Sequence, residues 1–439
     1  MNGTGAARLP RRVTRAMSTL AMAAVMAGCS ATATSTPTAS PTAVPTASPS
    51  PSATAAPSAT ATTSPAPTDT PAPSSTPSLP PMGWSAPQAV GPALKCDTYA
   101  ESALVVAIDA ASGDHAAYSC DGLIRLTESR AGSPTWATSS MPLPAGEKDL
   151  DPQLAVDGST LYVAYTRVVP EEGCGSDGFS DVSVWYRSRA LAGGAWSVAR
   201  QIGKSGEHLD ALRVVGGTIH VAVHGGASMV YETVHGSTAH RYTIADLTGM
   251  SVPALRVGDD GKARVAYEPG DGGITFGTFT GSGFATSQVA GSEEGWDPVM
   301  VLGKGDAAYL LWNRSPEPGG CVIRDAEPTD GTYFSTDAGG AWHTSRLTPL
   351  VGEASLTVDT STGTVDAVVS GSDDYDAPRV EGFAYFMGPA GGPWVQTMLL
   401  PAEVQSPVIK LDTATGALLV MYETTAANGT TQSYVMRRP

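Results

Sequence analysis

From residue 83 onward, short apolar runs alternate with Gly- and Asp-rich turns. A typical unit has one apolar run, a tight turn, and a second run that ends in a large residue, as in Val-Ala-Tyr267 and Val-Met-Tyr422; Val-Ala-Val223 is a variant. Runs of this length between turn residues predict β-strands, because Gly and Asp adopt the backbone conformations that tight turns require. Helical periodicity of useful length is missing from this part of the sequence. We therefore predict an all-β fold.

An aromatic residue opens the last strand of each unit and recurs about every 50 residues. These positions are Trp84, Trp136, Trp196, Tyr242, Phe284, Trp342 and Trp394. Each unit reads as four strands, here called A to D, which is the pattern of a β-propeller blade. The sequence predicts a seven-bladed propeller. Six blades is the alternative, because the Tyr242 unit has the weakest pattern.

The two ends of the repeat predict how the ring closes. The last unit supplies only three strands, near 407–411, 418–423 and 432–437. The missing D strand matches Trp84–Val90, whose sequence resembles Trp196–Ile202. An N-terminal strand that completes the last blade would hide two sheet edges.

The N-terminus has the layout of an export signal. Residues 1–29 contain a basic stretch and an apolar run too short to span a bilayer. The segment Met26-Ala27-Gly28-Cys29 resembles the bacterial lipobox, which implies cleavage before Cys29 and lipid attachment to its thiol. An ordinary secretory signal is the alternative. We expect an extracytoplasmic, lipid-anchored protein at the bacterial cell membrane, partly secreted at most.

The remaining composition defines the domains and excludes some partners. Residues 30–82 are almost entirely Ser, Thr, Ala and Pro and predict a disordered linker. Residues 83–439 form the propeller domain. The formal net charge of −16 repels phosphate backbones, so we expect no nucleic-acid partner. We also expect a monomer that contacts the membrane only through its anchor.

A turn motif in the fifth unit points to a known class of propellers. The segment Ser335-Thr-Asp337-Ala-Gly339-Gly-Ala-Trp342 matches the Asp-box pattern Ser-x-Asp-x-Gly-x-x-Trp. Residues 83–439 therefore resemble the Asp-box, or BNR-repeat, propellers, whose best-known members are sialidases. We expect a structural role for this turn: Asp337 accepts backbone N–H groups, Gly339 adopts a left-handed conformation, and Trp342 packs between sheets.

Sialidases use three arginines, a Tyr–Glu nucleophile pair and an Asp acid/base, and the first arginine belongs to the entry of the first blade. The corresponding stretch, residues 96–105, contains no arginine. Arg167, Arg314 and Arg379 follow B strands and are candidate ligand-binding residues. The catalytic residues are unknown, and the sequence favours binding over catalysis.

In a propeller, the D-to-A and B-to-C loops share one face, so residues before A strands surround its centre. The candidates here are Asp151, Asp210, Asp297 and Glu353, with Ser406 in the last unit. Carboxylates in such a ring suit Ca²⁺, sugar hydroxyls or a cationic peptide. The alternative is that they form local turn bonds at strand starts. Trp296 is a candidate for stacking on a sugar. We expect no obligatory cofactor.

Histidines and cysteines add two further hypotheses. His208, Asp210 and His224 should approach the same face and could bind Zn²⁺ or a similar ion. Cys96 and Cys120 are predicted to form a disulfide because of their positions in one blade. Cys174 and Cys321 then remain, in two long B-to-C loops, either as a second disulfide or as free thiols.

Taken together, these features predict a lipid-anchored propeller that binds a cell-surface glycan or protein. One alternative is a sialidase-like glycoside hydrolase of the exo-α-sialidase type with a degenerate active site. Another is a scaffold for an envelope complex.

Overall fold

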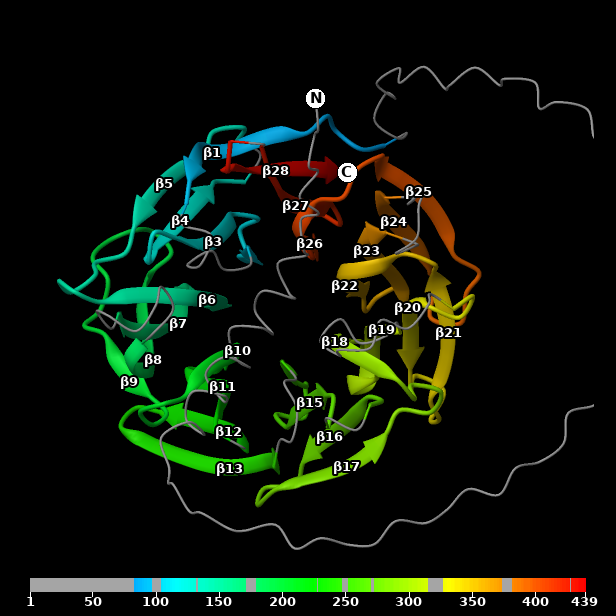
Figure 1. Cartoon of the computed structure of the whole chain (residues 1–439), viewed down its shortest axis with the longest axis horizontal. Coiled ribbons are helices and arrows are strands. Elements are labelled where there is room, and N and C mark those ends of the chain that lie inside the picture. Colours follow the sequence, from blue (N-terminus) through cyan, green and yellow to red (C-terminus); the bar gives the residue numbers. More distant parts are fainter. Residues whose placement is uncertain are drawn as a thin grey trace, which may run out of the picture. The chain divides into compact units, whose positions relative to one another are not determined.

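The computed structural model describes residues 83–96, 104–131, 133–170, 179–226, 228–246, 252–269, 272–314, 327–372, 381–426 and 428–439. Within these ranges the regular elements are strands, apart from one short 3₁₀ turn at Lys304–Asp306. The strands form seven four-stranded antiparallel sheets, which surround one centre in Figure 1. The seven-bladed propeller is confirmed, and the six-bladed alternative is wrong. None of the described residues forms a helix long and apolar enough to cross a membrane.

We number the blades I to VII along the chain, each listed from its innermost strand outward. Blade I contains β2 (Val105–Ile108), β3 (Asp114–Cys120), β4 (Leu123–Ser129) and β5 (Ala137–Ser140). Blade II contains β6 (Lys148–Asp157), β7 (Thr160–Pro170), β8 (Phe179–Ala190) and β9 (Arg200–Ile202). Blade III contains β10 (His208–Val215), β11 (Thr218–Gly225), β12 (Ser228–His235) and β13 (Thr238–Asp246). Blade IV contains β14 (Ala254–Val257), β15 (Ala263–Tyr267), β16 (Thr275–Phe279) and β17 (Phe284–Gln288).

The remaining blades follow the same order. Blade V contains β18 (Gly295–Leu302), β19 (Ala308–Arg314), β20 (Gly331–Thr336) and β21 (His343–Thr348). Blade VI contains β22 (Val351–Asp359), β23 (Thr364–Ser372), β24 (Glu381–Pro389) and β25 (Val395–Leu400). Blade VII contains β26 (Gln405–Leu411), β27 (Leu418–Thr425), β28 (Thr430–Arg438) and the N-terminal strand β1 (Gln88–Lys95).

The ring closes as the sequence predicts. β1 pairs antiparallel with β28, and Gln88 lies opposite Val435. Trp84, just before β1, is only 7% exposed and belongs to the apolar core shared by blades VI and VII. Its ring meets Tyr385 of blade VI edge-on at 5.1 Å between centroids. The two ends of the described propeller are therefore joined by backbone pairing and by packing.

A disulfide adds a covalent link close to this closure. Cys96 and Cys120 are bonded, with their Cα atoms 5.0 Å apart. Cys96 directly follows β1 of blade VII, whereas Cys120 ends β3 of blade I. The predicted pairing is confirmed, and it connects the last blade to the first.

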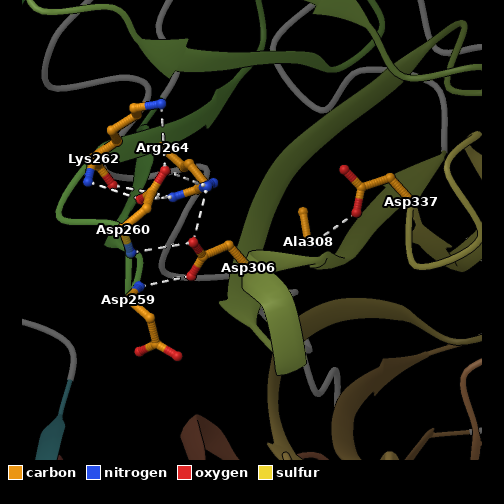
Figure 2. A network of polar contacts seen from close by, with 7 residues as sticks. All are labelled: Asp259, Asp260, Lys262, Arg264, Asp306, Ala308 and Asp337. Atoms are coloured by element: carbon orange, nitrogen blue, oxygen red, sulfur yellow. Dashed lines mark hydrogen bonds and ion pairs between the residues drawn. The ribbon is translucent and has the colours of Figure 1, made fainter.

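The Asp-box-like turn has the expected structural contacts, with one correction. The Asp337 carboxylate accepts a hydrogen bond from the Ala308 N–H at 2.7 Å, as Figure 2 shows. Trp342 packs edge-on against Phe276 of blade IV. The left-handed glycine, however, is Gly340, with φ of 84°, and not Gly339. The reason is that the Gly340 N–H donates to the Asp337 carbonyl and closes a four-residue turn, which leaves Gly340 at its fourth position.

A neighbouring polar network links blades IV and V on the same side of the ring. The buried Arg264 guanidinium bonds the Asp260 carboxylate at 2.9 Å and the Asp306 carboxylate at 3.2 Å. Asp306 also accepts the Asp259 backbone N–H at 2.7 Å (Figure 2). Arg264 lowers the pKa of Asp260 to about 2, chiefly through their hydrogen bonds. This network joins the A-to-B turns of two blades, opposite the predicted binding face.

Candidate ligand-binding face

Backbone bulges interrupt the innermost strands of four blades at similar positions. The ladder register shifts between Leu150 and Gln153, Leu209 and Ala211, Trp296 and Val299, and Gln405 and Val408. A bulge leaves extra residues unpaired and redirects a side chain. Such bulges are common near functional sites, and here they affect the N-terminal ends of β6, β10, β18 and β26.

Three of the predicted face residues lie in these bulges with left-handed backbones. Asp151 has φ of 49°, Asp297 has φ of 56° and Ser406 has φ of 50°. A proline follows each one and cannot donate to the ladder, which favours a bulge there. Each of these residues lies inside its strand rather than at its first position.

Asp210 occupies the bulge of β10 and contacts His224. Its buried carboxylate is 2.7 Å from Nδ1 of His224. The rings of His208 and His224 are stacked, with centroids 5.1 Å apart. The structure therefore brings the three predicted metal-ligating residues together, although no group of three or more His, Cys, Asp or Glu within the described ranges is arranged to hold a metal.

Glu353 lies on β22, whose ladder has no register shift. Its carboxylate accepts a hydrogen bond from the Ser406 backbone N–H in the next blade. The predicted carboxylates thus come from blades II, III, V and VI, and Glu353 also supports the bulge of blade VII. Acidic and hydroxyl groups from five blades occupy the same end of the innermost strands.

Arg167 is buried rather than open to a ligand. It is 6% exposed and forms two hydrogen bonds to Asp149, from Nε at 2.7 Å and from Nη2 at 3.1 Å. Glu147 lies 2.9 Å from the same Nε, and the guanidinium lies over the Trp185 ring at 5.1 Å. Burial raises the pKa of Asp149 even though Arg167 opposes the shift. Arg167 therefore holds the start of β6 against β7 and β8.

The arginine and the tryptophan of blade V have more accessible surroundings. Arg314 pairs with Glu294 at 2.9 Å, and the Glu294 side chain is about half exposed. Trp296 is partly buried and lies opposite Asn313 in the ladder. By contrast, the neighbouring Trp312 is buried and stacks on Tyr333. Trp296 is therefore the better-placed aromatic residue for a ligand on this face.

Several predicted residues lie outside the part of the chain that the structure describes. These are Cys29, Cys174, Cys321 and Arg379. The second disulfide and the third candidate arginine therefore stay predictions.

Two acidic residues of this face were not among the residues predicted from the sequence. Asp149 and Glu147 are the partners of Arg167, and they precede Asp151 by two and four residues. Alternation of this kind predicts side chains on the same face of an extended chain, although in the structure Asp151 lies in the bulge of β6. The acidic pattern at residues 147, 149 and 151 was therefore a usable signal, but the pairing to Arg167 needed the strand register.

Comparison with known proteins supports the fold and leaves the family open. No protein-family model matches the chain, and a search of curated proteins finds no significant relative. Among solved structures, the GH93 α-L-arabinofuranosidase of Fusarium graminearum is similar, with a TM-score of 0.50 and 10% identity over 80% of this chain and 96% of that one. The polysaccharide lyase Uly1 has a TM-score of 0.49 and 10% identity over 76% of this chain and 89% of that one.

A sialidase of Trypanosoma rangeli in complex with sialic acid has a TM-score of 0.45 and 10% identity over 77% of this chain. The chain spans about half of that protein, 54% of its length. At 10% identity the likeness to the arabinofuranosidase shows the fold alone.

Proposed function

We propose that this protein is a glycan-binding propeller whose ligand sits on the face formed by the bulged ends of the innermost strands. The observation that carries the proposal is the recurrence of the bulge in four blades, each with an Asp or Ser at its centre. Repeated, redirected polar side chains around one centre suit a ligand with many hydroxyl groups. The solved propellers named above act on or bind carbohydrates according to their titles, which agrees with this ligand class.

Binding is favoured over hydrolysis because the best candidate for a substrate-clamping arginine is already engaged. Arg167 is neutralised by Asp149 and Glu147, and a ligand carboxylate would have to displace both. The acidic surroundings would also repel an anionic sugar. A neutral glycan whose hydroxyls donate to carboxylates fits the face better than sialic acid does.

A screen with two readouts tests this function. The purified protein is applied to a glycan array and, in parallel, to chromogenic glycosidase substrates, including an α-sialoside. We expect saturable binding of neutral glycans without turnover. Turnover of any substrate would favour the hydrolase alternative, and an empty array together with no turnover would contradict the proposal.

We further propose that Cys29 anchors the protein outside the cytoplasm, with residues 30–82 as the spacer. The support is the lipobox-like segment and the composition of the spacer. Replacement of Cys29 by Ser should release the protein from the membrane fraction into the medium, because a serine hydroxyl cannot carry the thioether-linked lipid. Equal membrane retention of Cys29→Ser and the wild type would refute the anchor.

A further inference from the structure

Three cations occupy equivalent positions on innermost strands. Arg213 lies on β10, Arg256 on β14 and Lys410 on β26. The ladders place Arg213 opposite His220, Arg256 opposite Arg264, and Lys410 opposite Leu419. Each of these partners directly precedes the repeat triplet that ends at Val223, Tyr267 or Tyr422. The cations therefore belong to one level of the ring, which we call the cation layer.

The strands that carry the cation layer surround the centre of the ring. They are edge strands of their sheets, and β10 and β26 lie nearest the centre of their blades in Figure 1. Blades III and VII are not neighbours, yet the charge of Arg213 acts on Lys410. Side chains from separated blades can approach each other only across the centre.

None of the three cations forms an ion pair with a carboxylate in the described part of the chain. Arg213 and Arg256 each donate one hydrogen bond to the carbonyl of the preceding residue, at 2.8 Å for Arg256. A guanidinium has five N–H donors, so within the described part of the chain most donors of Arg213 and Arg256 have no hydrogen-bond partner. Burial lowers the pKa of Arg213 to about 10. Burial, helped by the Arg213 charge, lowers the pKa of Lys410 to about 8.

The acidic residues of the binding face do not neutralise this layer. Asp210 precedes Arg213 by three residues, and Ser406 precedes Lys410 by four. At about 3.3 Å per residue, the two levels are separated by roughly 10–13 Å along the strands. All three side chains are partly buried. Like charges that are partly buried, with no ion pair to a carboxylate in the described part of the chain, are costly, and an anion between them would remove that cost.

We propose that the cation layer binds a small inorganic oxyanion, such as sulfate or phosphate, at the centre of the ring. The two arginines would supply directed N–H forks and Lys410 a point charge, which is the combination that suits oxyanions. The inference does not depend on the proposed glycan function, because it concerns a different level of the same strands.

Calorimetric titration tests this site in the full-length protein at constant ionic strength with chloride as the background anion. Sulfate and phosphate should each bind once per chain. Lys410→Met should weaken both at least tenfold. The matched control is Lys262→Met, because the Lys262 side chain is 56% exposed and lies in the network of Figure 2 on blade IV. The affinity of Lys262→Met for sulfate should equal that of the wild type.

Several results would overturn the site. The wild type could give no heat of binding with either anion. Lys410→Met and Lys262→Met could lose the same amount of affinity for sulfate. The protein could also bind glucuronate but neither sulfate nor phosphate. Lys410→Met should melt in chloride at the wild-type temperature or above, because a repulsive charge is removed, and a lower melting temperature would mean a structural role instead. If Lys410→Met does not fold, the site can be tested by diffusing selenate into crystals of the wild type. An anomalous-scattering peak between Arg213 and Lys410 would support the site, and the absence of a peak there would refute it.

Discussion

Truncation of Trp84 to alanine should loosen the ring at its closure. The side chain fills the apolar core between blades VI and VII and contacts Tyr385 edge-on at 5.1 Å. β1, which it precedes, is the only described strand that blade VII takes from the N-terminal end of the propeller. The substitution removes packing without altering a backbone hydrogen bond of the β1–β28 ladder.

The expected magnitude follows from the burial of this side chain. A tryptophan that is 7% exposed loses nearly all of its contacts on truncation, and such changes cost about 3–5 kcal/mol. Unfolding entropy near 60 °C is about 2.1 cal/mol/K per residue, or roughly 0.7 kcal/mol/K for about 350 residues. The melting temperature should therefore fall by about 4–7 °C.

Two assays read the effect and its location. Differential scanning calorimetry gives the melting temperature, and hydrogen exchange gives the protection of β1 and β28. Protection should fall in these two strands and stay unchanged in β10 and β11 of blade III. Val198→Ala is the control, because Val198 is 83% exposed and its truncation should change neither readout. An unchanged melting temperature for Trp84→Ala, or an equal loss of protection in all blades, would refute closure by this strand.

Two further predictions concern pH and the disulfide. His115 is 2.8 Å from Glu128 and 3.1 Å from Asp109; burial alone would lower its pKa, but these carboxylates outweigh burial and raise it. A histidine whose pKa is raised in the folded state stabilises the fold at pH values below its unfolded pKa, which is near 6.5. Urea titrations should therefore show that His115→Gln loses more free energy of unfolding at pH 5 than at pH 8. Equal losses at the two pH values would contradict this. The Cys96–Cys120 bond spans 24 residues, so replacing both cysteines by serine should cost about 3 kcal/mol in the same assay, and a cost near zero would show that the bond is dispensable.

The repeat made the fold predictable from sequence. Strand count, blade count and closure all followed from the spacing of aromatic residues and from the match between Trp84–Val90 and Trp196–Ile202. The Cys96–Cys120 pair was also predicted, although the sequence assigned both cysteines to one blade, whereas Cys96 follows β1 of blade VII. These features depend on order along the chain, which the sequence displays directly.

The details of the site were less predictable, because they depend on register and depth. Asp151 and Asp297 precede prolines and were open to interpretation as strand starts, whereas the ladders place them in bulges. Arg167 follows a B strand as predicted, but its burial against Asp149 depends on pairing between β6 and β7. The left-handed turn glycine is Gly340 rather than Gly339, because the Gly340 N–H closes the turn on the Asp337 carbonyl.

The cation layer illustrates the limit most clearly. Arg213, Arg256 and Lys410 lie in different units with no shared sequence motif. Their common level becomes visible only once the A and B strands are aligned by pairing. A ring brings such residues together from distant parts of the chain.

The central claim is that a glycan binds over the bulged strand ends. The most direct measurement is calorimetric titration of the best array glycan into the wild type, Asp297→Asn and Asp359→Asn. Asparagine tolerates the left-handed backbone at position 297, so Asp297→Asn removes the charge and keeps the bulge. Asp359→Asn is the matched control, because the Asp359 carboxylate accepts the Ser361 N–H in its own turn and lies at the end of β22 opposite the binding face. The account predicts an affinity loss of about tenfold or more for Asp297→Asn, as expected for a charged hydrogen bond of at least about 1.4 kcal/mol, and wild-type affinity for Asp359→Asn. Wild-type affinity for Asp297→Asn, or an equal loss in both variants, would contradict it.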